Sequence, residues 1–264
     1  MTPMGERRFG KVNWLGLQTL ALRETQRFMA VWTQTVLAPL VTSALFLGVF
    51  TLAIGPARGE VMGVPFIEFL APGILTMTVI QNAFANTSSS IVISKVQGNI
   101  VDTLMPPLSA SELVAGYLAG GVLRGALVAF TITLGLVLVL GHSVAHPLWA
   151  AIFVVLGAIL LGGMGVIAGI LAQKFDQMAA ITNFVITPLA FLSGTFYSIE
   201  RLPEGLQSII YLNPVFYLID GVRYGFIGTS DSDPMLGLMV CLLSCAAVTG
   251  LCWRWFSTGY RLKA

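Results

Sequence analysis

Charged residues are scarce in this sequence. It has 14 Lys and Arg and 12 Asp and Glu among 264 residues, so only 10% of the chain is charged. A soluble globular domain averages about 25%. The hydrophobic share is 56%, which excludes an ordinary soluble domain. The few charges cluster at the boundaries of long charge-free runs. These runs are 28–57, 69–94, 125–173, 177–199 and 234–253.

The lengths of these runs predict membrane crossings. A helix needs about 20 predominantly apolar residues to cross the hydrocarbon core of a bilayer. Four of the runs fit one crossing each, and 125–173 fits two. We therefore expect an all-α polytopic membrane protein, with one transmembrane domain over residues 1–264. The six predicted spans are 31–54, 69–93, 113–140, 148–172, 178–197 and 235–253.

Several chemistries have no support in the sequence. A net charge of +2 is too small to favour nucleic acid, so no nucleic-acid partner is expected. The cysteines, Cys241, Cys245 and Cys252, all fall in the last apolar run, where cysteine packs as a small hydrophobe. His142 and His146 flank a short turn without further ligands, so we expect no metal site.

Nucleotide and hydrolase motifs are missing as well. The sequence has no G-x-x-x-x-G-K-[ST] phosphate loop, no H-E-x-x-H and no G-x-S-x-G. Its glycines instead recur four residues apart inside the apolar runs, a spacing that favours close contact between membrane helices. The pairs are Gly116 and Gly120, Gly121 and Gly125, and Gly165 and Gly169.

An amphipathic segment precedes the first apolar run. Over 12–29, large apolar residues alternate with Gln18, Arg23, Glu24 and Arg27. Such a helix lies in the membrane interface with its basic side toward the lipid headgroups. A solvent-exposed leader is the alternative, but Trp14 and Trp32 bracket the segment like headgroup anchors.

The distribution of basic residues predicts cytoplasmic termini. Six spans place both ends of the chain on one side, and basic residues concentrate in cytoplasmic loops. With the N-terminus inside, ten basic residues lie inside and three outside. The inside residues are Arg7, Arg8, Lys11, Arg23, Arg27, Lys95, Lys174, Arg254, Arg261 and Lys263, and the outside residues are Arg58, Arg201 and Arg223.

One apolar stretch is too short to cross the membrane. Residues 205–219 carry no charge, but Asn213-Pro214 interrupts them, and proline disfavours a helix in the residue before it. We expect a re-entrant helical hairpin over 198–230 on the outer side, before the last span. A plain external loop is the alternative, although such apolarity is costly in water.

Arg124 is the one basic residue deep inside a predicted span, roughly 16 Å from its start at 1.5 Å per residue. It either snorkels to the interface or pairs within the bundle, or it contacts an anionic or polar substrate. Asn82 and Asn86 on the second span offer further polar groups. We take Asn82, Asn86 and Arg124 as a candidate substrate path.

The ordered set of features resembles the ABC-2 family of ABC transporter permeases, in particular its YadH-type bacterial subgroup. The resemblance covers nearly the whole chain. It is carried by five pieces, which are RETQRF at 23–28, FLAPG at 69–73, GNIVDTLMPP at 98–107, GTFYS at 194–198 and NPVFYLIDGVRYGFIG at 213–228.

This resemblance implies the permease subunit of an ATP-driven exporter in the bacterial inner membrane. It implies a homodimer that binds two copies of a separate ATP-binding cassette ATPase, which would hold ATP and Mg, with no cofactor on this chain. The exported substrate would be a polysaccharide, a lipid-linked glycan, a lipid or a drug.

The resemblance also implies roles for individual residues. The connecting helix would contribute Arg23, Glu24 and Arg27 to ATPase coupling. The loop 94–110 would hold the coupling helix, and a second contact would follow the fourth span. The residues concerned are Gly98, Asn99, Ile100, Asp102, Leu104, Met105, Pro106, Phe175 and Asp176. The external gate would include Asn213, Pro214, Tyr217 and Arg223.

The sequence leaves two other functions open. An intramembrane lipid-modifying enzyme needs an acid, base or metal cluster inside the spans, and Arg124 is the only clear charge there. A membrane scaffold without transport needs no such cluster.

Overall fold

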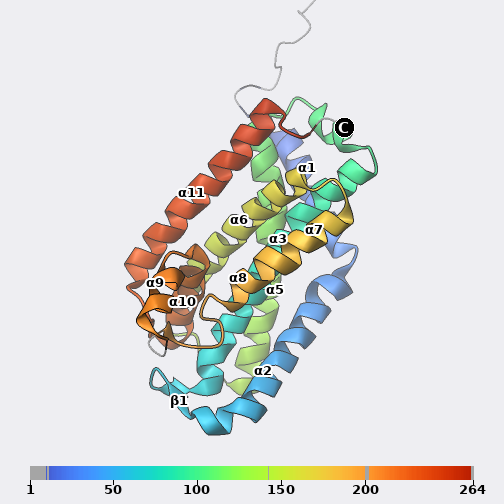
Figure 1. Ribbon diagram of the computed structural model, residues 1–264. Helices are drawn as coiled ribbons and strands as arrows, with labels where there is room; N and C mark the ends of the chain where they lie inside the picture. The colour runs from blue at the N-terminus through green and yellow to red at the C-terminus, as the bar shows by residue number, and fades with distance from the viewer. Residues whose placement is uncertain (1–9, 11, 142, 200–201, 263–264) are drawn as a thin grey trace, which may run out of the picture.

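The computed structural model describes residues 10, 12–141, 143–199 and 202–262 as a bundle of long helices (Figure 1). Among these residues, five segments are long and apolar enough to cross a membrane, namely Thr33–Ala57, Phe66–Val96, Ala110–Val139, Pro147–Leu171 and Pro234–Thr258. They belong to the π-helical turn η1 (Thr33–Leu37) with α2 (Ala38–Arg58), and to α3 (Phe66–Val96), α5 (Ala110–Leu140), α6 (Pro147–Leu171) and α11 (Pro234–Thr258). A helical polytopic membrane protein is therefore confirmed.

Shorter elements lie before and between these helices. They are α1 (Trp14–Met29), α4 (Ile100–Leu104), α7 (Phe175–Ile181), the π-helical turn η2 (Thr182–Ile186), α8 (Thr187–Phe191), α9 (Glu204–Tyr211) and α10 (Pro214–Ile227). The strands β1 (Glu60–Val61) and β2 (Val64–Pro65) form an antiparallel hairpin that the sequence did not predict, with Glu60 opposite Pro65.

The simple fifth span predicted over 178–197 is not confirmed. The helix there begins at Phe175, passes through η2 and ends at Phe191, with elements of only 7, 5 and 5 residues. Gly194 has a φ of +77°, and such a left-handed backbone ends a helix. Residues 192–198 therefore turn instead of completing the predicted span.

The core lies along α3 and α6. In the most apolar stretch of α3, 78% of the residues are buried, against 11% for the stretch that contains α2. The predicted glycine contacts are present: a Cβ at Gly165 would lie 2.5 Å from the Phe84 carbonyl oxygen, and one at Gly169 would lie 2.9 Å from Ile91 Cβ. The close contact between α6 and α3 therefore requires glycine on α6. Helix α2 lies at the edge of the bundle.

The short elements that connect the long helices lie at two opposite ends of the bundle. In Figure 1, α1 and the C-terminal end of α11 lie at the upper end, while β1, α9 and α10 lie lower. Near the upper end, Lys95 Nζ donates to the carbonyls of Ile170 and Ala172, both at 2.7 Å, which brings the end of α6 next to the end of α3. Arg7, Arg8, Lys11, His142, Arg201 and Lys263 lie outside the described residues.

The predicted break at Asn213-Pro214 is where α9 ends and α10 begins. Asn213 Oδ1 accepts the Val215 N–H at 3.0 Å, so this residue caps α10, and Pro214 occupies its first turn. Helix α10 is buried from Val215 to Arg223 and packs against α3, α6 and α11. Helix α9 is more exposed, with Ile209 64% accessible.

Candidate functional site

A buried carboxylate holds α1 to the bundle. Glu24 is fully buried, and its oxygens accept bonds from Arg23 Nη2 at 3.0 Å, Arg27 Nη2 at 3.2 Å and Ser90 Oγ at 2.8 Å. We call Arg23, Glu24 and Arg27 the α1 latch. Since one carboxylate serves two guanidinium groups and a hydroxyl of α3, the latch fixes both the position of α1 and the orientation of its arginines.

Small residues on α5 allow this burial. A Cβ at Gly116 would lie 2.5 Å from Leu20 Cδ2, and one at Gly120 would lie 2.5 Å from Glu24 Cβ. At the start of α1, the Asn13 N–H donates to Glu112 Oε1 at 2.7 Å. The predicted amphipathic helix therefore packs along α5, with Leu20 and Phe28 buried and with Trp14, Leu15 and Leu22 exposed on its other side.

The two arginines of the latch reach α4 and make a second contact with α3. Arg23 Nη1 donates to Thr103 Oγ1 of α4 at 2.8 Å, and Arg27 Nη2 donates to Asn86 Oδ1 of α3 at 2.9 Å. Burial by itself lowers the pKa of Arg23, but Tyr117 and Glu24 outweigh it, so the pKa is raised above its ordinary value. Arg23 therefore stays charged, and the latch links α4 to a transmembrane helix.

Helix α4 presents an apolar and acidic surface at this end of the bundle. Ile100 and Thr103 point into the protein, whereas Asp102 is exposed and Met105 is 76% accessible. Pro106 follows, so the exposed turn is stopped by proline. Side chains that face outward at this end are available to a partner, whereas Glu24 and Ile100 only position their neighbours.

The remaining predicted coupling residues are also either exposed to a partner or partly buried in the protein. Gly98, Asn99, Phe175 and Asp176 are exposed, and Leu104 is half-buried. Gly98 has a φ of +71°, which glycine adopts readily where α3 ends. The loop before α7 is braced by the Gln173 N–H, which donates to Gln177 Oε1 at 2.8 Å.

Arg124 lies next to the latch. It is four residues beyond Gly120 on α5, about 6 Å along the helix, and Gly120 contacts Glu24. Its Nη2 donates to Asn82 Oδ1 at 3.0 Å, so it pairs within the bundle. Its buried Nε has no hydrogen-bond partner in the described part of the chain. The structure therefore joins Asn82 to Arg124, but joins Asn86 to Arg27.

A second polar cluster lies at the opposite end. Arg223 is fully buried, with Nη1 3.7 Å from Asp220 Oδ1 and 3.5 Å from Asp231 Oδ2. Its Nη2 donates to the Gly194 carbonyl at 2.7 Å. Asp220 also accepts the backbone N–H groups of Asp231 and Ser232 at 2.8 and 2.9 Å. We call Asp220, Arg223 and Asp231 the outer ion-pair cluster.

Three of the sequence motifs meet at this cluster. The Arg223 guanidinium lies 4.0 Å from the centre of the Phe69 ring, which belongs to FLAPG. A Cβ at Gly73 of the same motif would lie 2.5 Å from the Thr195 carbonyl oxygen, within GTFYS. The third motif supplies Arg223 itself. Residues from α3, α10 and the 192–198 turn are thus held together.

The predicted gate residues Asn213 and Tyr217 make hydrogen bonds of their own at this end of the bundle. Asn213 Nδ2 donates to Ser193 Oγ at 2.7 Å, and Tyr217 Oη donates to the Tyr211 carbonyl at 3.1 Å. Asp220 and Asp231 were not among the residues predicted for this site. Asp220 had a signal, because a carboxylate three residues before Arg223 on a helix is a potential ion pair. Asp231 had none.

Comparisons with known proteins agree with the sequence motifs. Residues 16–227 match the model of the ABC-2 type transporter family. The chain is 35% identical over 251 residues to Inner membrane transport permease YadH of Escherichia coli (strain K12), covering 95% of this chain and 98% of that one.

More distant relatives are named nodulation proteins. The chain is 25% identical over 242 residues to Nodulation protein J of Rhizobium leguminosarum bv. viciae, covering 88% of each chain. It is 27% identical over 233 residues to Nodulation protein J of Neorhizobium galegae, covering 81% of this chain and 87% of that one. Since the family match covers most of the chain, this protein belongs to the ABC-2 type transporter family of membrane permeases.

Proposed function

We propose that this chain is the membrane subunit of an ATP-driven exporter whose ATP is hydrolysed on a separate chain. The observation that carries the proposal is the connection between α4 and the spans. The exposed side chains of α4 lie on a turn that Ile100 anchors in the core, and Thr103 binds Arg23 of the latch. A partner that pushes on α4 therefore acts through the latch on α3.

The missing phosphate loop also supports ATP hydrolysis on a separate chain. A permease of this family with no nucleotide-binding motif of its own needs a second chain to hold ATP and Mg. ATP binding there biases a two-state rearrangement of the permease through α4 and the Phe175–Asp176 loop. Relatives named transport permeases favour this function over a lipid-modifying enzyme.

The docking face can be tested by two substitutions. Asp102→Arg reverses the exposed charge of α4, and Met105→Glu places a charge on the exposed apolar side chain that directly follows α4, at 76% accessibility. Each is expected to reduce co-purification of a candidate ATP-binding cassette ATPase about tenfold or more, because an unpaired charge at an interface core costs at least about 1.4 kcal/mol. The measurement is affinity capture from detergent-solubilised membranes.

Glu204→Arg is the matched control, since Glu204 is exposed on α9 at the opposite end. It should leave capture unchanged, and all three variants should insert in the membrane as the parent does. Unaltered capture with both α4 variants would show that the ATPase docks elsewhere.

The membrane arrangement follows from the same proposal. The helical segment from Phe175 to Phe191 serves as the fifth of six crossings, although it is short. Its exposed Phe184, at 82% accessibility, faces lipid or a second copy. Both termini are then cytoplasmic in the bacterial inner membrane, and α9 with α10 forms the external re-entrant hairpin. Cysteine labelling from each side of the membrane tests this topology.

Two copies of this chain complete the transporter in the proposal. Helix α2 has a long exposed apolar side, with Leu45 and Leu52 62% and 81% accessible, which a second copy or lipid has to cover. The mass of the purified protein in nanodiscs distinguishes a monomer from a homodimer.

Arg124 and Asn82 are proposed to face the transported molecule. Their bond leaves Arg124 Nε without a partner in the described residues, and Glu24, the nearby acid, is already shared by two arginines. An anionic or polar group on the substrate satisfies this charge. Asn86 acts through Arg27, and the outer ion-pair cluster with Asn213, Pro214 and Tyr217 shapes the external gate.

A further inference from the structure

Lys95 is a half-buried residue in the last turn of α3, shortly before α4 begins at Ile100. Its Nζ donates to the carbonyl oxygens of Ile170 and Ala172 at the end of α6, each at 2.7 Å. Residues 173–177, which contain the second proposed contact of the ATPase, follow Ala172 directly. One side chain therefore joins the helix that leads into α4 to the helix that leads into the 173–177 loop.

The ammonium group of Lys95 binds the end of α6 at three points. Lysine has three N–H donors, and a third contact joins Nζ to the Gly169 carbonyl oxygen at 3.4 Å. The last carbonyl groups of a helix have no partner within the helix, and a cation next to them is also attracted by the negative end of the helix dipole. Lys95 therefore satisfies the end of α6 from a different helix.

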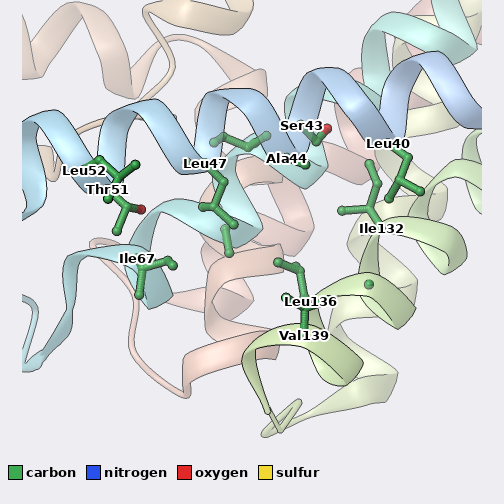
Figure 2. Close-up of a pocket in the computed structure, with 14 residues that line it drawn as sticks. Leu40, Ser43, Ala44, Leu47, Thr51, Leu52, Ile67, Ile132, Leu136 and Val139 are labelled. Atoms are coloured by element: carbon green, nitrogen blue, oxygen red, sulfur yellow. The ribbon is translucent and has the colours of Figure 1, made fainter.

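Helices α3 and α6 also pack closely below this end. Thr87 Oγ1 of α3 donates to the Gly162 carbonyl of α6 at 2.7 Å. Between α2 and α3, by contrast, lies an open groove with Leu47 and Ile67 among its lining residues (Figure 2). Helices α3 and α6 therefore form one packed unit, and α2 stands apart from it.

Helix α4 is attached to the same unit. Ile100 of α4 is 4% exposed and belongs to one buried cluster with Ile91 of α3 and Ile170 of α6. Just before α4, the Asn99 N–H donates to the Ser94 carbonyl of α3 at 3.0 Å. Since the connection from α3 to α4 is short and braced, a displacement of α4 also displaces the end of α3 that carries Lys95.

The 173–177 loop holds no buried side chain that could anchor it. Its residues are all exposed, and α7, which begins within it, has no buried residue. The Gln173 N–H donates to Gln177 Oε1 at 2.8 Å, but this bond stays within the loop. The position of the loop therefore depends on the end of α6, which Lys95 holds.

From these contacts we infer that Lys95 is a positioning residue that makes α4 and the 173–177 loop move as one unit. The inference rests on the proposed function, because it takes both segments as contacts of the ATPase. When the ATPase displaces α4, the Lys95 ammonium group carries the displacement to the end of α6 and so to the second contact. Without it, both segments keep their exposed side chains, but their relative position is no longer fixed.

The first test uses the purified full-length permease in nanodiscs, without ATPase or nucleotide. Hydrogen exchange measured by mass spectrometry follows the peptides 97–105 and 171–178. Lys95→Met removes the ammonium group and keeps an unbranched side chain. It is expected to raise the exchange rates of both peptides about two- to tenfold, the change that corresponds to the loss of one hydrogen bond.

Three further variants serve this test. Lys95→Arg keeps a cation with several N–H donors and should restore slow exchange in both peptides. Lys95→Gln, which also removes the charge, replaces Lys95→Met if that variant does not fold. Lys174→Met is the matched control, because it removes an exposed lysine from the loop itself, and it should leave the exchange of 97–105 unchanged.

The second test adds a candidate ATP-binding cassette ATPase. Lys95→Met should still capture it, because Asp102 and Phe175 stay exposed. In proteoliposomes, however, the change that the permease causes in the rate of ATP hydrolysis should fall severalfold, and Lys95→Arg should recover it.

Three outcomes overturn the inference. Faster exchange confined to 171–178 would show that Lys95 only caps α6, and unchanged exchange in both peptides would show that it holds neither segment. A folded Lys95→Met protein with both peptides loosened but full control of the hydrolysis rate would show that the two contacts need not move together. Failure of the proposed function is a separate result, since the parent protein itself would then capture no ATPase, whatever the exchange rates.

Discussion

Replacing Arg223 with methionine is expected to destabilise the folded protein by about 3–5 kcal/mol. Methionine keeps much of the volume but leaves Asp220 and Asp231 as buried carboxylates without a cation, and it frees the Gly194 carbonyl. Breaking one side of a buried ion pair is costly because the remaining charge has no water to solvate it. The measurement is the unfolding temperature of the purified protein in detergent, which should fall by about 10 °C.

Two further variants sharpen this prediction. Arg223→Lys retains the charge but not the planar fork that reaches Asp231 and Gly194 together, so its unfolding temperature should be intermediate. Arg254→Met is the control, because Arg254 is exposed on α11. An Arg223→Met protein as stable as the parent would show that the outer ion-pair cluster does not hold the α10 region together.

Glu24→Gln is expected to release α1 from α5. The amide keeps the shape but removes the negative charge that Arg23 and Arg27 share. The arginine side chains are 44% and 27% exposed and regain some hydration, so we expect about 1–2 kcal/mol rather than the full cost of a buried pair. That free energy corresponds to a change of about 5- to 30-fold in the population of the detached state.

Detachment can be read from one buried side chain of α1. Leu20 is 5% exposed against Gly116, so a Leu20→Cys background reports opening through its reaction rate with a water-soluble maleimide. The native cysteines are buried and react slowly. Glu24→Gln should raise the rate about 5- to 30-fold, whereas Glu204→Gln, at an exposed site, should not. Equal rates in all three proteins would contradict the role of the latch.

Hydropathy located most of the fold because bilayer thickness fixes the length of an apolar run. It misjudged the segment after α6, since apolarity continues past Phe191 while Gly194 turns the backbone away from the helix. The hairpin of β1 and β2 was missed, because two-residue strands have no periodicity to detect.

The candidate sites were only partly predictable for a related reason. Local sequence indicated that Arg23, Glu24 and Arg27 share one amphipathic helix, but not that Gly120 lets Glu24 become fully buried. Likewise Arg223 was a candidate, whereas its contacts with Asp231 and Phe69 depend on tertiary packing. Motifs far apart in the chain converge at one place only after folding.

We propose that a separate ATPase drives this permease through α4. The direct measurement is ATP hydrolysis in proteoliposomes that contain the purified permease, a candidate ATP-binding cassette ATPase, or both. We predict no hydrolysis by the permease alone, and a rate for the pair that changes when Asp102→Arg is introduced in α4. Hydrolysis by the permease alone, or a pair whose rate is indifferent to the permease and to α4, would contradict the claim.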